Sequence, residues 1–312
     1  MSGTRVERMI ETYLAGRESS TMKSYQSSFA KLGRICRKMD ISLYNLDELA
    51  RCEVWVECRM QELSASAIKG LSAVISLVRE VLGQPEVVSG REKVMKRSVI
   101  KSSNITGKKR KSRRKEAGIE DVLAVVAEAR RTGSKADYRV AMMCVLCFFG
   151  IRRLADVREV RVKDVVRIDD HLEVFIKKHK TDVEGTGDHF TLVRKGKRLH
   201  IHRFLEEYIA KMGIIGSDAL FPVELGRGVK RKAVSYSIMY VSLESVKTRL
   251  GMDGNITWHS FRVGAATRGT CLGVRRNVIK KAGLWRSSAV DIYCRESNPG
   301  VLLSLALAND ME

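Results

Sequence analysis

The stretch WHSFRVGAATRG, residues 258–269, places His259 and Arg262 three positions apart, which is close to one turn of a helix. Further along, the stretch AGLWRSSAVDIYCRE carries Trp285 and Tyr293 eight positions apart. Taken singly, such residues are more often a polar helix surface and two core aromatics than a reactive site. The composition and the other motifs of the chain therefore have to decide between these interpretations.

The charge of the chain favours a polyanionic partner. Its 312 residues include 57 Lys and Arg against 36 Asp and Glu, a formal net charge of +21. Because each neutralised phosphate releases condensed counterions, nucleic acid is the leading candidate and an anionic membrane surface is the second. No apolar run of about 18 or more residues is present, so we expect no membrane association.

The seven cysteines have no spacing typical of a disulfide framework, which predicts a reducing intracellular compartment. Cys144 and Cys147 form a C-x-x-C, but they lie in the apolar run VAMMCVLCFFG, so we interpret them as core residues of a buried helix. No other cluster of residues has the spacing of a metal site, and we expect neither a metal nor another cofactor. The expected location is the nucleus in a eukaryote, and otherwise the cytoplasm or nucleoid.

Helical periodicity divides the chain into three parts. Residues 1–88 contain four helical segments, of which ASAIKGLSAVISLVREVLG is the clearest, and they predict a small helical bundle. Residues 89–115 lose this pattern and predict a linker. Residues 116–312 are helical again, except that residues 171–195 alternate apolar and polar positions around a Gly-containing loop, which predicts a β-hairpin with Lys180 at the turn end of its first strand. The predicted fold is mainly α, a helical bundle followed by an α-rich domain with a small antiparallel β-sheet.

The predicted linker is strongly basic. Between Arg91 and Lys115 it holds twelve Lys and Arg against one acid, Glu92. The run KKRKSRRK within it is a solvated tether, a nuclear import signal or a segment that lies along a phosphate backbone, and we favour the last, which is compatible with import. The residues expected to contact DNA are Lys108, Lys109, Arg110, Lys111, Arg113, Arg114 and Lys115.

A further stretch, FFGIRRLADVREVRVKDV at residues 148–165, completes a pattern. Together with the hairpin lysine, the H-x-x-R and the terminal aromatics, it resembles the catalytic core of the tyrosine recombinases, also called the phage integrase family. The first box of that family has the form G-L-R-I-S-E-L with a later Asp. An alignment on Arg153 places Asp156 at the acidic position and Asp164 at the later one, whereas an alignment on Arg152 breaks these matches.

The remaining boxes of the family match in order. Lys180 in HKT takes the place of the hairpin lysine, HSFR supplies the H-x-x-R of His259 and Arg262, Trp285 fills a position that holds His or Trp in the family, and Tyr293 stands where the nucleophile belongs. The eight-residue interval from Trp to Tyr is similar to the pattern G-R-W-S-S-D-A-x-x-x-Y of recombinases from DIRS-type retroelements, although here a Leu precedes the Trp. The motifs cover roughly the second half of the chain, from residue 140 to residue 295.

These residue types suit the attack of a phenol on a phosphodiester. Two guanidinium groups can hold the non-bridging oxygens bidentately, and we assign this to Arg153 and Arg262. A tyrosine can form a covalent link to the phosphate and be displaced from it later, which makes Tyr293 the expected nucleophile. The departing sugar oxygen needs a proton, and Lys180 is placed to give it.

Three residues are expected to support this chemistry. His259 assists proton transfer or binds a phosphate oxygen, Trp285 donates its indole N–H to the same phosphate, and Asp156 orients an arginine or His259. Because the phosphotyrosyl bond stores the energy of the broken bond, neither ATP nor metal is required. The resemblance further implies a 3′-phosphotyrosyl link, a free 5′-hydroxyl and strand exchange through a Holliday junction by a homo-tetramer on paired DNA sites.

The sequence therefore predicts a site-specific DNA recombinase of a mobile element. In this interpretation residues 1–88 are a core-binding domain that contacts DNA, residues 89–115 are the basic linker, and residues 116–312 are the catalytic domain with its C-terminal tail. A type IB topoisomerase uses a similar residue set, but the order H-x-x-R and the Trp near the nucleophile favour a recombinase. A non-catalytic DNA-binding relative stays open as a further alternative.

The last fourteen residues, PGVLLSLALANDME, are apolar but too short to span a bilayer. An exposed apolar segment of this kind has to dock on another surface. It docks either on its own domain or, as the resemblance implies, on a neighbouring protomer. We expect the second arrangement, with Pro299 and Gly300 as the exit from the domain.

Overall fold

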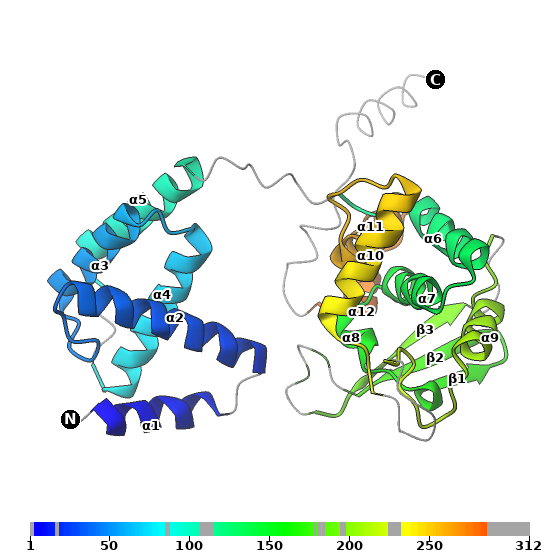
Figure 1. The fold of residues 1–312 in the computed structure, drawn as a ribbon, viewed down its shortest axis with the longest axis horizontal. Coiled ribbons are helices and arrows are strands. Elements are labelled where there is room, and N and C mark those ends of the chain that lie inside the picture. Colours follow the sequence, from blue (N-terminus) through cyan, green and yellow to red (C-terminus); the bar gives the residue numbers. More distant parts are fainter. Residues whose placement is uncertain are drawn as a thin grey trace. The chain divides into compact units, whose positions relative to one another are not determined.

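The computed structural model describes residues 3–15, 19–84, 88–106, 115–177, 179, 182, 185–193, 198–223 and 232–285. The chain divides into two compact units, Met1–Lys111 and Ser112–Glu312. In the described residues the structure is mainly helical, with twelve α-helices and one three-stranded antiparallel sheet, which confirms the predicted fold class (Figure 1). No helix in the described part of the chain is long and apolar enough to cross a bilayer.

The first unit is a helical bundle. Its helices are α1 (Gly3–Leu14), α2 (Ser19–Lys38), α3 (Glu48–Met60), α4 (Ala65–Val81) and α5 (Gly90–Thr106). The apolar stripe of α4 is buried as its periodicity predicts, with Ile68 and Leu71 fully covered. Side-chain oxygens cap the N-termini of two of the helices. Asp47 accepts a hydrogen bond from the N–H of Ala50 (2.8 Å), and Ser64 accepts one from the N–H of Ala67 (3.3 Å).

Helix α5 corrects the predicted linker of residues 89–115, since a packed helix occupies most of it. The helix lies against α3 and α4 and buries Val99. Its single acid, Glu92, is 3% exposed and pairs with the buried Arg51, Nε to Oε2 at 2.9 Å, while the indole of Trp55 also donates to it (3.4 Å). The sequence did not predict this helix, because it has few apolar positions and because a buried ion pair leaves no periodic pattern. Six of the seven basic residues assigned to DNA, from Lys108 to Arg114, lie outside the described residues.

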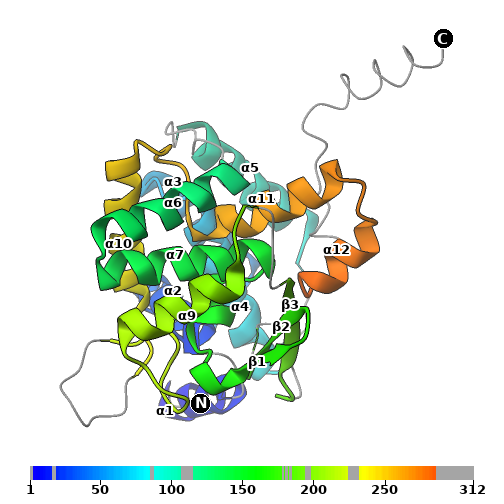
Figure 2. The ribbon, with the colours of Figure 1, turned by 90° about the vertical axis from the view of Figure 1, so that its right-hand side faces the viewer.

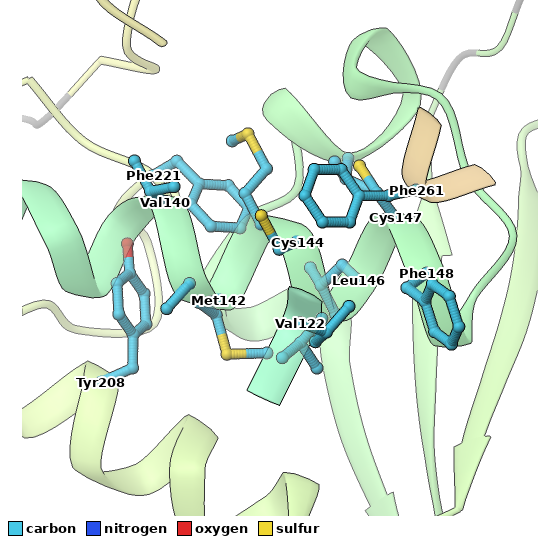
Figure 3. Packing of buried hydrophobic residues seen from close by; sticks show 14 of the residues in the cluster. Val122, Val140, Met142, Cys144, Leu146, Cys147, Phe148, Tyr208, Phe221 and Phe261 are labelled. Atoms are coloured by element: carbon cyan, nitrogen blue, oxygen red, sulfur yellow. The ribbon is translucent and has the colours of Figure 1, made fainter. Parts of the chain in front are cut away.

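The second unit is built around one central helix, α7 (Lys135–Phe149). Its helical neighbours are α6 (Ile119–Thr132), α8 (Leu154–Arg158), α9 (Ile201–Met212), α10 (Tyr236–Leu250) and α11 (Trp258–Cys271) (Figure 2). Figure 3 shows side chains of α7 packed against Tyr208, Phe221 and Phe261. Cys144 and Cys147 are fully buried there, and burial raises the pKa of both thiols, so they are core residues as expected.

The sheet follows α8 and a 3₁₀ turn (Val162–Asp164) in the order β1–β2–β3. Its strands are β1 (Val165–Ile168), β2 (His171–Ile176) and β3 (Asp188–Val193). The register pairs Val174 with Val165 on one side and with Phe190 on the other, and the inward positions of β2 and β3 are buried. The predicted hairpin is thus present. The edge strand β1 was not predicted, because it is short and mostly exposed and lacks the alternation of a half-buried strand.

The segment just before α6 packs against α11 and is hydrogen-bonded to it. The N–H of Ala117 donates to the carbonyl of Ser260 (3.1 Å), and Ala117 is fully buried. A Cβ atom at Gly264 would lie 1.8 Å from the carbonyl oxygen of Ala117, so only glycine permits this approach. The chain then passes through α12 (Arg276–Ala282) to Trp285. The C-terminal tail expected to dock, residues 299–312, lies outside the described residues.

Candidate catalytic site

A cleft of about 720 Å³ opens in the second unit between the β2–β3 loop and the end of α12. His179, Asp182 and Asp188 line it from the loop, and Lys280, Lys281 and Trp285 line it from the other side. Acidic groups thus face basic ones across the cleft. Figure 2 shows α12 beyond the end of α11, on the side of the unit where the sheet lies.

Arg262 lies next to this cleft and is completely buried. Its Nη1 donates to the carbonyl of Ile151 (2.9 Å) and its Nη2 to that of Gly283 (2.6 Å). Its guanidinium also lies 3.8 Å from the centre of the Trp285 ring, a cation–π contact. A single arginine on α11 therefore joins the turn after α7, the end of α12 and the tryptophan that lines the cleft.

Gly283 is required at this junction. A Cβ atom at this position would lie 1.9 Å from Cζ3 of Trp285, and the N–H of Trp285 donates to the carbonyl of Lys280 (3.0 Å). The chain therefore folds back over a glycine to bring the indole ring onto Arg262. This contact fixes Trp285, which is only 7% exposed.

Arg153 begins helix α8 and is the more accessible of the two predicted clamp residues. Its side chain is 25% exposed, and its Nη1 lies 3.7 Å from Oδ2 of Asp156. The same carboxylate oxygen accepts from the backbone N–H of Arg153 (3.1 Å) and is itself almost completely buried. Asp156 thus contacts both the backbone and the side chain of Arg153. Because Ile151, bound to Arg262, is two residues earlier, the structure brings the first box, the H-x-x-R and Trp285 together.

Other predicted residues are placed as follows. His259 lies partly buried in the first turn of α11. Neither it nor the two predicted clamp arginines line the cleft. Lys115 is exposed and pairs with Asp253 at 3.5 Å. Lys180 and Tyr293 lie outside the described residues, although both neighbours of the Lys180 position that are described, His179 and Asp182, line the cleft.

Arg152, the arginine that the motif alignment rejects, is 1% exposed and lies against the ring of Phe190, with its Cζ 4.8 Å from the ring centre. Burial lowers its pKa to about 10, although the nearby Asp156 opposes this shift. Its Nε and Nη1 have no hydrogen-bond partner among the described residues. The cation is therefore held by packing on β3, whereas Arg153 reaches the surface.

Three further residues that no sequence motif marks, Asp182, Lys280 and Lys281, also line the cleft. A signal for the first of them is present, because Asp182 stands just before Gly185 and Gly187, and an Asp ahead of glycines is typical of a side-chain-capped turn. No group of three or more His, Cys, Asp or Glu side chains that could hold a metal ion occurs among the described residues.

No family model matches the chain, and no curated protein matches it. Solved structures do resemble it. The XerH site-specific recombinase, bound to a palindromic difH substrate in a post-cleavage complex, gives a TM-score of 0.64 at 15% sequence identity, over 94% of this chain and 80% of its own. A lambda integrase dimer bound to a COC′ core site gives 0.63 at 14% identity, over 96% and 78%. A lambda integrase tetramer bound to a Holliday junction gives 0.60 at 13% identity, over 91% and 77%. At these identities the likeness shows the fold alone: the chain has the fold of the tyrosine recombinases and integrases.

Proposed function

We propose that the chain is a site-specific DNA recombinase that cuts and rejoins double-stranded DNA through a 3′-phosphotyrosyl intermediate. The observation that carries this proposal is the junction at Arg262, where the first box, the H-x-x-R helix and Trp285 meet beside the cleft. In the sequence, Ile151 of the first box lies 111 residues from Arg262, and Gly283 lies 21 residues from it. Their meeting at one guanidinium is expected of a composite phosphate site and not of unrelated surface charges.

The proposed reaction conserves bond energy. The phenolic oxygen of Tyr293 attacks the phosphorus and gives up its proton, for which His259 is the predicted acceptor. The bond between phosphorus and the 5′ oxygen breaks, and that oxygen takes a proton from Lys180. Rejoining reverses these steps with the 5′-hydroxyl of a partner strand, which displaces Tyr293 and restores a phosphodiester.

Arg153 and Arg262 are proposed to stabilise the charge on the non-bridging oxygens. The two guanidinium groups differ in burial, since Arg153 is partly exposed and Arg262 is covered by Trp285. Contact of Arg262 with a phosphate therefore requires the Trp285 segment to shift when DNA binds. Once exposed, Trp285 can donate its indole N–H to the same phosphate.

DNA binding and assembly belong to the same proposal. The first unit and the basic run of residues 108–115 are proposed to hold the duplex, so replacing the run with neutral residues should flatten the salt dependence of the affinity. A tetramer on paired sites is proposed to be linked by residues 300–312. Deleting them should abolish assembly on paired sites and leave single-site binding nearly intact; equal assembly, or an unfolded protein, would place the tail on its own domain. The Trp–Tyr interval supports a DIRS-type relative, and the location would be the nucleus in a eukaryote.

The test of the chemistry is covalent trapping on nicked suicide substrates made from the DNA that flanks the gene. Tyr293→Phe should bind DNA normally and form no adduct, because the nucleophile is absent. The matched control is Tyr240→Phe, which removes the hydroxyl of a tyrosine that is 48% exposed on α10. Peptide mapping should find the DNA on Tyr293. An adduct on Tyr240, or a wild-type protein that forms none on any flanking sequence, would contradict the proposal.

A further inference from the structure

The β2–β3 loop is organised by one carboxylate. Oδ1 of Asp182 accepts from the N–H groups of Gly185 (2.9 Å) and Thr186 (3.2 Å), and Oδ2 accepts from that of Gly187 (3.0 Å). Both glycines have a positive φ, +72° and +76°, which residues with a side chain rarely adopt. A Cβ atom at Gly187 would also lie 2.6 Å from the carbonyl oxygen of Ile176. Residues 185–187, in the second half of this loop, are thus all hydrogen-bonded to Asp182.

Asp182 also contacts His179, the described residue before position 180. The N–H of Asp182 donates to the carbonyl of His179 (3.0 Å), so Asp182 is bound to the chain on both sides of itself. His179 is 9% exposed, and its Nε2 lies 3.9 Å from Oδ2 of Asp188, the first residue of β3. Described and hydrogen-bonded residues therefore flank position 180 in the sequence, at 179 and at 182.

The ionised form of Asp182 is the one that fits this role. Burial alone would raise the pKa of its carboxyl group, but hydrogen bonds from Gly187 and Gly185 and the proximity of His179 outweigh this and lower the pKa below its usual value. A carboxylate that accepts three backbone N–H groups holds a loop more firmly than a neutral side chain, since charge-assisted hydrogen bonds are about twice as strong as neutral ones.

We infer that Asp182 is a positioning residue for Lys180: it joins His179 to Gly185, Thr186 and Gly187 within the loop that carries the lysine, and His179 and Asp182 line the cleft opposite Trp285. This inference rests on the proposed function, in which Lys180 protonates the leaving oxygen. A loop without this anchor still carries the lysine but leaves it in many positions, and a misplacement of about 1 Å can cost about 100-fold in rate. Asp182 thereby acts through Lys180 and does not contact the reacting atoms.

The leaving group offers a readout that isolates this role. With a normal substrate, the electron pair of the broken bond passes to the 5′ oxygen, which takes a proton from Lys180. With sulfur in that bridging position, the bond between phosphorus and sulfur breaks and the group leaves as a thiolate, which needs no proton because thiols are much stronger acids than alcohols. A defect in delivering the proton therefore disappears with the sulfur substrate, whereas a defect in folding or phosphate binding persists.

The experiment measures single-turnover cleavage by the full-length protein on matched oxygen and 5′-sulfur substrates. Asp182→Ala should slow cleavage of the oxygen substrate by about 100-fold and restore nearly normal rates on the sulfur substrate. Asp182→Asn, whose amide oxygen still accepts from the loop, should lose less. The matched control, Asp170→Ala, removes an exposed carboxylate at the other end of β2 and should leave both rates unchanged. Thermal midpoints and DNA affinity are measured for each variant.

The results separate this inference from the function on which it rests. If Asp182→Ala is equally slow on both substrates, or cleaves the oxygen substrate at the wild-type rate, Asp182 does not position the proton donor and the inference is wrong while the recombinase proposal stands. If Lys180→Ala cleaves the oxygen substrate normally, Lys180 is not the donor and the inference fails with that assignment. An absence of any Tyr293 adduct in the wild type overturns both.

Discussion

Trp285 takes part in two regions of the candidate site that differ in burial. In one, its ring covers Arg262, which is fully buried and bonded to two backbone carbonyls. In the other, it lines an open cleft with Lys280 and Lys281, opposite the loop organised by Asp182. The difference predicts that the buried arginine contributes to folding as well as to the proposed chemistry, whereas the cleft residues contribute to the proposed chemistry and DNA binding alone.

The largest expected effect is that of Arg262→Ala. It leaves the carbonyls of Ile151 and Gly283 without their donor and a void beneath Trp285, so the free energy of unfolding should fall by about 3 kcal/mol and cleavage by several orders of magnitude. Thermal unfolding and covalent trapping measure the two losses. A variant that is as stable as the wild type would remove the distinction between the two regions.

Arg153→Ala should separate chemistry from stability. Its side chain is one-quarter exposed and its contact with Asp156 is long, so the loss of stability should be about 1 kcal/mol or less. Removal of one charge-stabilising group should still slow cleavage by about 100- to 1,000-fold. The matched comparison is Arg152→Ala, which takes a buried cation away from Phe190. The assignment of the first-box arginine is wrong if Arg152→Ala loses cleavage at unchanged stability and Arg153→Ala does not.

The smallest effect should come from Lys280→Gln combined with Lys281→Gln. These side chains line the open cleft, so their neutralisation should leave the thermal midpoint unchanged. Because these lysines are proposed to face phosphates, the logarithmic salt slope of DNA binding should fall by up to about 0.9 for each phosphate that is no longer neutralised. Replacing Arg130 and Arg198 with Gln is the control, because these arginines pair with Glu207 and Glu120. A slope that the control pair lowers equally would mean that net charge alone is being measured.

Strong periodic patterns made much of the fold predictable. Helix α7 reads as an almost continuous apolar run and is buried on all sides, and the alternation of residues 171–176 gives β2 correctly. Helix α5 escaped prediction because its apolar stripe is thin and its contact with the bundle depends on the buried pair of Arg51 and Glu92, which lie 41 residues apart. A charge-rich segment is therefore not evidence of a linker when its one acid has a buried partner.

The site was predictable in its residue types but not in its contacts. The spacing of the motifs is enough to nominate Arg262 and Trp285 by resemblance. Their burial depends on the hydrogen bonds of Arg262 to two backbone carbonyls, which lie 111 and 21 residues away in the sequence. No local sequence pattern encodes such partners. Asp182 is intermediate, since its local turn chemistry is visible in the sequence but its place in the cleft follows only from the arrangement of the sheet and α12.

The close approach of Ala117 to Gly264 has a practical consequence for dividing the protein. Ala117, which precedes α6, packs against Gly264 of α11, the helix that carries His259 and Arg262, and donates a backbone hydrogen bond to this helix. An expressed fragment of the second unit that begins at α6 would uncover Gly264 and leave the Ser260 carbonyl without its donor. The minimal autonomous fragment therefore has to start before Ala117, and a protease cut just after that residue should loosen α11 before any other helix of the unit.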